Sequence, residues 1–191
     1  MEFGRVISPI WLLLLYVVIG IYGAKKELTL GERAGQLTDM ATKKPILTLN
    51  AEKFKQYVKA TPRNYSMIVM FTALATNRQC GICRHASDEY QLVGNSWRYS
   101  PTFSNKLFFS MLDFDEGSDI FQQLQLNSAP VFMHFPARGR PKKMDTLDIQ
   151  RVGFSSENIA RWVAERTEIQ ILWVAGAGGA ALDGRRSSLP S

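Results

Sequence analysis

Cysteine and histidine are scarce in this chain, which has two of each among its 191 residues. Two cysteines cannot build the several disulfides of a small secreted scaffold, and a single Cys-x-x-Cys pair makes a poor zinc site. The composition, 46% hydrophobic and 21% charged, excludes a disordered or fibrous chain. A domain of roughly 150 residues buries about 70% of its unfolded surface, so it needs neither a metal nor a disulfide to fold. Both cysteines are therefore available for chemistry.

Long hydrophobic runs are also few, and the clearest one lies near the N-terminus. It covers Ile10–Ile21, follows the positive charge of Arg5 and precedes the small residues Gly23 and Ala24. This order is typical of a secretory signal, and the run is shorter than the ~20 residues of a membrane span. We expect residues 1–24 to be a signal peptide, with an uncleaved anchor as the alternative.

The C-terminal end is biased in composition. Ala175–Ala181 is all glycine and alanine, and Asp183–Ser191 is mostly polar. The apolar stretch Ile169–Leu182 is too short and too rich in glycine to span a membrane. We expect residues 172–191 to form a disordered tail after a folded domain at residues 25–171.

Acidic residues are outnumbered, which gives a net charge of +6 and a pI of about 9.4. The basic residues are scattered, apart from the pair Arg185-Arg186 and a group at Arg138, Arg140, Lys142 and Lys143. The group contains Gly139 and Pro141, which favour a solvated hairpin loop over a phosphate-binding patch. We predict no nucleic-acid partner.

Hydrophobic periodicity predicts alternating helices and strands. The continuous apolar run Ser66–Thr72 is typical of a central parallel strand that is buried on both faces. The expected order is helix Leu28–Thr42, strand Ile46–Leu49, helix Ala51–Lys59, strand Ser66–Thr72, helix Cys80–Ser96, strand Phe108–Asp113, helix Ser118–Leu124, strand Val131–Phe135, a turn through Pro136–Lys143, a second hairpin arm within Asp145–Val152, and a last helix from Ser155 or Ser156 to Arg166. This order predicts an α/β fold of the thioredoxin type, a mixed central sheet with helices on both faces.

The pair Cys80 and Cys83 is the candidate catalytic site, as a redox dithiol that closes to a disulfide. It follows a buried strand and opens a helix, where free backbone N–H groups and the helix dipole stabilise a thiolate. Cys80 is then the exposed nucleophile, with help from Arg78. Cys83 lies one helical turn further, on the same face, and is placed to resolve a mixed disulfide.

Two other readings of the cysteine pair stay open. It is a buried structural pair in the first, and in the second it binds a metal together with His85 and His134. Redox chemistry is favoured over both because of the position before a helix, so we predict no metal and no cofactor.

Two further positions are candidate sites. Ala129-Pro130 comes directly before a strand, where this fold places a cis proline that faces the dithiol and whose backbone pairs with an extended peptide. An ordinary trans proline is the alternative. Asn64-Tyr65-Ser66 is a glycosylation sequon, although a buried strand begins next to it.

Four stretches carry a resemblance to a known family. They are Pro62–Leu74, Asn95–Ser100, Asp113–Gly117 and Asn127–Pro130. With them the chain resembles, from about Glu27 to Ile171, the thioredoxin-like subunit of the oligosaccharyltransferase complex, the family that includes the tumour suppressor candidate and magnesium transporter proteins.

The resemblance implies a domain in the endoplasmic reticulum lumen with an accessory role in protein N-glycosylation. Such a domain holds nascent cysteine-containing glycoproteins through a transient mixed disulfide, and its partners are the catalytic and other subunits of oligosaccharyltransferase. The alternatives are a general secretory-pathway disulfide oxidoreductase or isomerase, and a non-enzymatic subunit linked to magnesium transport. Family members continue into several membrane spans, whereas this sequence diverges after about Leu172.

One difference from thioredoxin itself bears on turnover. Thioredoxin has a buried acid on the central strand, and Met70 stands at that place here. We expect slow turnover as a general reductase.

Overall fold

The structure is a computed structural model that describes residues 28–172. The predicted signal peptide and nearly all of the predicted tail lie outside these residues. Among the helices between residues 28 and 172, none has the length and apolar character that crossing a membrane requires.

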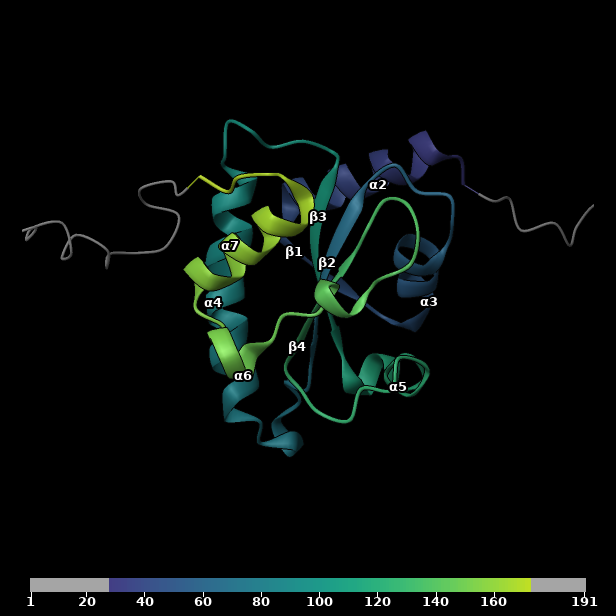
Figure 1. Cartoon of the computed structure of the whole chain (residues 1–191). Coiled ribbons are helices and arrows are strands. Elements are labelled where there is room, and N and C mark those ends of the chain that lie inside the picture. The colour runs from purple at the N-terminus through teal and green to yellow at the C-terminus, as the bar shows by residue number, and fades with distance from the viewer. Residues whose placement is uncertain (1–27, 173–191) are drawn as a thin grey trace, which may run out of the picture.

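A four-stranded mixed sheet forms the centre of the domain (Figure 1). Its strands are β1 (Ile46–Leu49), β2 (Ser66–Thr72), β3 (Leu107–Asp113) and β4 (Val131–Phe135), in the spatial order β1-β3-β2-β4. β3 pairs in parallel with β1 and β2, and β4 pairs antiparallel with β2. The apolar run that predicted a central strand is therefore β2, which has a partner on each side.

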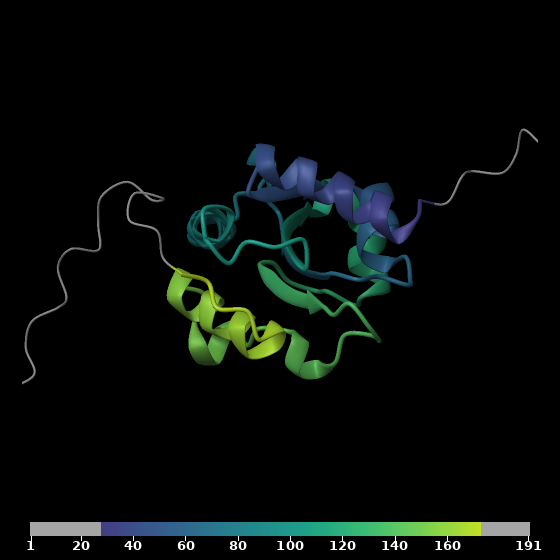
Figure 2. The same ribbon diagram turned by 90° about the horizontal axis from the view of Figure 1, so that it is seen from above.

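Helices cover both faces of this sheet, as the sequence predicted (Figure 2). α2, η1 and α5 pack on one face, and α4 and α7 pack on the other. The helical elements are α2 (Leu30–Lys43), α3 (Ala51–Lys53), the π-helix η1 (Phe54–Lys59), the 3₁₀ turn η2 (Thr76–Arg78), α4 (Gly81–Arg98), α5 (Phe114–Gln123), the 3₁₀ turn η3 (Lys143–Asp145), α6 (Ile149–Val152) and α7 (Ser156–Thr167).

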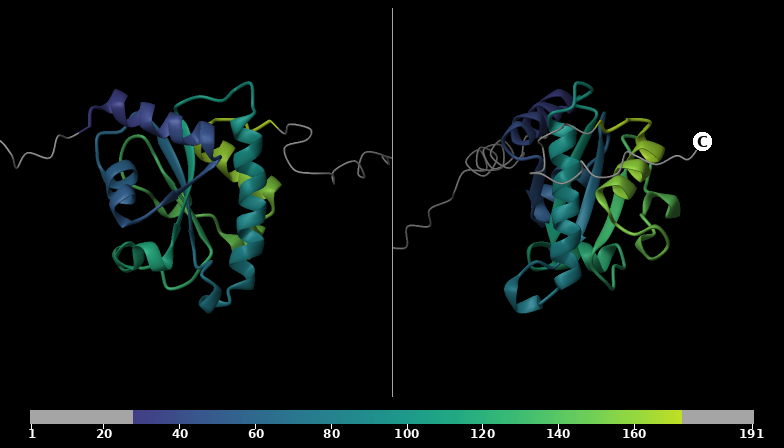
Figure 3. Two further views of the ribbon diagram at one scale, coloured as in Figure 1. Left: turned by 180° about the vertical axis from the view of Figure 1, so that it is seen from behind. Right: turned by 90° about the vertical axis from the view of Figure 1, so that its left-hand side faces the viewer.

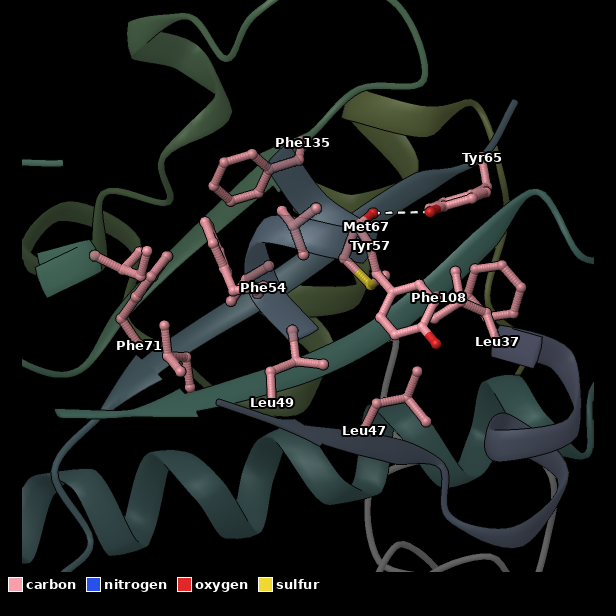
Figure 4. Packing of buried hydrophobic residues seen from close by; sticks show 14 of the residues in the cluster. Leu37, Leu47, Leu49, Phe54, Tyr57, Tyr65, Met67, Phe71, Phe108 and Phe135 are labelled. Atoms are coloured by element: carbon pink, nitrogen blue, oxygen red, sulfur yellow. Dashed lines mark hydrogen bonds between the residues drawn. The ribbon is translucent and has the colours of Figure 1, made fainter. Parts of the chain in front are cut away.

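Aromatic rings fill the core on the α2 side (Figure 4). Phe71 lies with its ring centroid 5.9 Å from that of Phe54, 5.3 Å from Phe121 and 6.4 Å from Phe135. Tyr65 is buried at the other end of this core, where its hydroxyl donates to the Tyr57 carbonyl oxygen at 2.8 Å. Ring contacts at these distances add to the hydrophobic stabilisation of the sheet.

The opposite core fixes α4, the helix that begins at the cysteines. This helix runs along the whole sheet (Figure 3). The buried Tyr90 hydroxyl donates to the Ile68 carbonyl oxygen at 2.9 Å, and burial raises the pKa of this phenol well above its ordinary value. A Cβ at Gly94 would come within 2.4 Å of Ile46 Cδ1, so a larger residue there would require the Ile46 side chain to move.

The structure corrects the predicted second arm of the hairpin after β4. The chain returns along β4 for a single bridge, Met133 with Thr146, and one further hydrogen bond from Leu147 N to Phe132 O at 3.0 Å. Asp148 then caps α6, because its side chain accepts from Arg151 N at 3.2 Å. The local cap ends the pairing before a strand can form.

Two helices also differ from their predicted form. The helix predicted at Ala51–Lys59 is α3 followed by the π-helix η1. α5 begins at Phe114 and not at Ser118, since Asp113 caps a first turn that Gly117 interrupts with non-helical backbone angles. The sequence reading detected only the part of α5 beyond this interruption.

His134 and Asp145 pin the returning loop onto the sheet. His134 Nδ1 lies 2.9 Å from Asp145 Oδ1, and His134 Nε2 lies 3.2 Å from Ser66 Oγ. Burial of the imidazole lowers the pKa of His134 from its ordinary 6.5, with smaller contributions from Arg166 and Arg63, and the Asp145 carboxylate only partly opposes this.

The lowered pKa predicts how stability changes with pH. As the pH falls below 6.5, the unfolded chain takes up a proton on His134 before the folded chain does, so the free energy of unfolding decreases. Urea unfolding at roughly pH 7.5 and roughly pH 5.5 measures this, and His134→Gln should reduce the difference between the two. The exposed His85, replaced by glutamine, is the matched control. Equal pH dependence of the wild type and His134→Gln would exclude this histidine as the cause.

Candidate active site: the Cys80–Cys83 disulfide

The two cysteines form a disulfide at the start of α4, directly after β2 and η2. Cys80 is the residue that caps the helix, and its Sγ accepts a hydrogen bond from Cys83 N at 3.2 Å. α4 has 18 residues, long enough to present a full helix dipole and free N–H groups at this end. The sulfur of Cys80 therefore lies where negative charge is stabilised.

The two cysteines differ in their exposure to solvent. Cys80 is partly exposed, whereas Cys83 is completely buried. Ile82, between them, is 49% exposed and is one of the few large apolar side chains on the surface. A partner can reach Cys80 from solvent, and Cys83 only through Cys80.

Side chains from the β3–α5 turn hold the segment that leads from β2 to Cys80. Asp113 Oδ2 accepts from Leu74 N at 2.6 Å, while Asp113 Oδ1 accepts from Asp115 N at 3.0 Å. Arg78 pairs with Asp115 at 2.5 Å and lies 4.7 Å above the Phe114 ring. The sequence analysis gave these acidic residues no role, although Asp113–Gly117 is one of the four stretches that carry the family resemblance.

This pairing changes the role expected of Arg78. The guanidinium is engaged by Asp115, whose hydrogen bond lowers the pKa of the Asp115 carboxyl and raises the pKa of Arg78. The contacts of Arg78 thus order the loop between β2 and Cys80. The hydrogen bond that the structure shows to the Cys80 sulfur comes from Cys83 N, at the N-terminus of the helix.

Removal of the Asp113 carboxylate should loosen this loop. Asp113→Ala deletes the cap of α5 and the acceptor for Leu74 N, so we expect a loss of about 1–3 kcal/mol in unfolding free energy. We also expect faster reduction of the Cys80–Cys83 disulfide by dithiothreitol. Urea unfolding and thiol labelling measure the two effects. Glu116→Ala, at an exposed acidic residue of the same helical turn with no hydrogen bond or ion pair among the described residues, is the control. An equal effect in both variants would contradict the role of Asp113.

Pro130 lies at the end of the sheet from which the chain leads to the cysteines. The Ala129–Pro130 bond is cis, as predicted, and Pro130 is buried at the entrance to β4. Val131 pairs with Phe71, so Pro130 adjoins the carboxyl end of β2, from which the chain leads to Cys80. Ala129 is partly exposed beside it. Peptide binding by Ala129 and Pro130 stays a prediction.

β2, the strand that precedes the cysteines, has no carboxylate at the position where thioredoxin has its buried acid. Met70 is fully buried there, packed in the same core as Tyr90 and Phe132. Thr72, at the end of β2, is also fully buried, and its hydroxyl has no hydrogen-bond partner in the described residues. Neither side chain can accept and release a proton as a carboxylate does at neutral pH.

The two histidines are not joined with the cysteines. His85 is exposed with its ring 5.3 Å from that of Phe154, while His134 is engaged by Asp145. Within residues 28–172 no group of three or more His, Cys, Asp or Glu side chains is arranged to hold a metal ion.

Comparison with known proteins shows the family of the chain. The model of the OST3 / OST6 family, transporter family, matches residues 35–174. The chain belongs to the OST3/OST6 family. It is 55% identical over 147 residues to the human dolichyl-diphosphooligosaccharide–protein glycosyltransferase subunit MAGT1, and 56% identical to its zebrafish counterpart. The resemblance stated from sequence is thereby confirmed.

The relatives in the OST3/OST6 family are longer than this chain. The matched region covers 77% of the chain but 44% of the human and 45% of the zebrafish protein. Human ERp44 in its zinc-bound form is a structural neighbour with a TM-score of 0.51 at 18% identity, and the match covers 63% of this chain and 31% of ERp44. This likeness supports the predicted thioredoxin-like fold.

The sequon residue Asn64 is exposed and lies just before β2. Ser66 of the same sequon is already part of that strand, where its hydroxyl contacts His134 Nε2. Use of this sequon stays a prediction.

Proposed function

We propose that this chain is a thiol–disulfide exchanging accessory subunit of oligosaccharyltransferase. The observation that carries the proposal is the Cys80–Cys83 disulfide at a helix N-terminus, with one accessible and one buried sulfur, in a domain of the OST3/OST6 family. The related proteins are glycosyltransferase subunits by name, and we extend that role to this chain.

The exchange starts from the oxidised pair. A thiolate of a nascent chain attacks Cys80 Sγ, the Cys80–Cys83 bond breaks, and Cys83 leaves as a thiolate that takes up a proton. The client is now held by a mixed disulfide. Cys83 later returns its proton and attacks Cys80 Sγ, which releases the client thiol and restores the original disulfide. There is no net oxidation, so the cycle needs no cofactor.

The hold delays oxidative folding of the client near a glycosylation site. The clients are cysteine-containing glycoproteins in the endoplasmic reticulum lumen, and the other partners are the catalytic and remaining subunits of the complex. The absence of a carboxylate beside the cysteines at Met70 favours a slow hold over rapid general turnover.

Glycosylation in cells that lack the related subunits tests the proposal. The wild-type chain, fused to the part of the human relative that the matched region does not cover, should restore occupancy at sequons close to cysteines. Cys80→Ser/Cys83→Ser should not, and sequons in cysteine-free reporters should be unaffected. Equal restoration by both forms would overturn the role of the disulfide.

A refolding assay separates this role from that of a general isomerase. We expect the purified protein to accelerate refolding of a scrambled multi-disulfide substrate far less than protein disulfide isomerase does. Comparable acceleration by the two proteins would favour the general enzyme.

A further inference from the structure

A cleft of about 810 Å³ lies away from the cysteines, between the loop after β4 and helices α6 and α7. Its volume is within the range of sites that bind ligands. Its lining combines basic and apolar side chains. Two of the basic residues, Lys142 and Lys143, belong to the group for which the sequence predicted a solvated loop.

Positive charge dominates this cleft. Five cationic side chains line the cleft, whereas only two acidic side chains, those of Asp148 and Glu165, do so. Asp148 pairs with Arg151 at 3.6 Å. The remaining cationic residues form no ion pair in the part of the chain that the structure describes; they are Lys142, Lys143, Arg161 and Arg166. The lining of the cleft therefore carries a net positive charge.

The floor of the cleft is apolar. Leu147 and Trp162 are nearly fully buried there, and Met144 is 62% exposed at its edge. Trp162 Nε1 and Arg166 Nε are buried and have no hydrogen-bond partner among residues 28–172. The exposed Met144 and the edges of Leu147 and Trp162 therefore give the cleft an apolar component beside its cations.

We propose that this cleft binds an extended polypeptide segment in which acidic and apolar side chains alternate. Acidic groups meet the cations at the rim, and apolar groups cover the floor and Met144. An apolar floor disfavours a bare phosphate as the ligand, and a concave surface disfavours a flat membrane. The proposal goes beyond the proposed function, because it needs no cysteine.

The cleft is firmly joined to the part of the domain that bears the cysteines. The turn between α6 and α7 packs on the first half of α4, where Ser156 N donates to Glu89 Oε2 at 2.7 Å and Phe154 contacts His85. A partner segment in the cleft is thus held on the same side of the sheet as α4.

Fluorescence anisotropy with a short labelled peptide of alternating aspartate and leucine tests the proposal. We expect saturable binding that weakens with added salt, and about tenfold weaker binding of the peptide in which asparagine replaces aspartate. Cys80→Ser/Cys83→Ser should bind as tightly as the wild type, so failure here is distinguishable from failure of the disulfide role.

Charge reversal locates the site. Lys143→Glu/Arg161→Glu changes two exposed residues at the rim and should weaken binding by about tenfold or more. Lys53→Glu, at an exposed position in α3 on the other side of the sheet, should leave binding unchanged. Thermal unfolding should show that both variants remain folded.

Three results would overturn the proposal. They are equal binding of the aspartate and asparagine peptides, equal loss of binding in the two charge-reversal variants, and binding of phosphatidylserine vesicles without binding of either peptide.

Discussion

Replacement of Cys83 with serine is expected to convert the protein into a trap for its clients. The reduced Cys83→Ser variant, mixed with a one-cysteine peptide supplied as its disulfide-linked dimer, should gain the mass of one peptide on nearly every molecule. Cys80 attacks one peptide sulfur, and the second peptide leaves as a thiol. Intact-protein mass spectrometry measures the adduct.

The reason is the different placement of the two sulfurs. Cys80 caps α4 and is accessible, whereas Cys83 is buried one turn further along. In the reduced wild type, Cys83 attacks the mixed disulfide from within the same site and releases the peptide as a thiol. Without Cys83 nothing inside the site clears the adduct.

Cys80→Ser is the matched control, because it leaves Cys83 as the remaining cysteine of the variant. It should accumulate almost no adduct. Adducts of similar yield in both variants would show that the nucleophile is wrongly assigned or that the pair is structural.

Truncation of Phe71 is expected to cause the largest loss of stability. Phe71 is fully buried and its ring contacts those of Phe54, Phe121 and Phe135, which belong to three other elements. Phe71→Ala removes these contacts and leaves a cavity, so the free energy of unfolding should fall by about 3–5 kcal/mol. Urea unfolding followed by circular dichroism, with the disulfide intact, measures the loss.

Two variants serve as controls for this loss. Phe71→Leu keeps part of the volume and should lose roughly half as much. Tyr99→Ala, at a residue that is 59% exposed, should stay within about 0.5 kcal/mol of the wild type. A loss below about 1 kcal/mol for Phe71→Ala would contradict the packing described for β2.

Elements whose signal lies in their own residues could be predicted from sequence. β2 and β4 have the predicted bounds because a continuous apolar run and a preceding proline mark them. The capping box of Thr29 and Glu32 is formed as expected. Cys80 occupies the predicted helix start, since the change from strand to helix is visible in the chain itself.

Features that depend on distant contacts could not be predicted in this way. The bond from Leu74 N to Asp113 joins residues that are 39 positions apart, and no periodicity reports it. The supposed second hairpin arm was wrong because Asp148 caps α6 locally and competes with strand pairing. The basic cleft combines Lys143 with Arg161 from another segment, so its charge emerges only when the chain folds.

Competitive alkylation of the reduced protein tests most directly whether the cysteines form an asymmetric exchange site. Trypsin releases both in one peptide, Gln79–Arg84, in which fragment ions distinguish iodoacetamide on Cys80 from iodoacetamide on Cys83. If the site is asymmetric, iodoacetamide should label the accessible Cys80 at least about tenfold faster than Cys83. Equal rates, or faster labelling of Cys83, would contradict it.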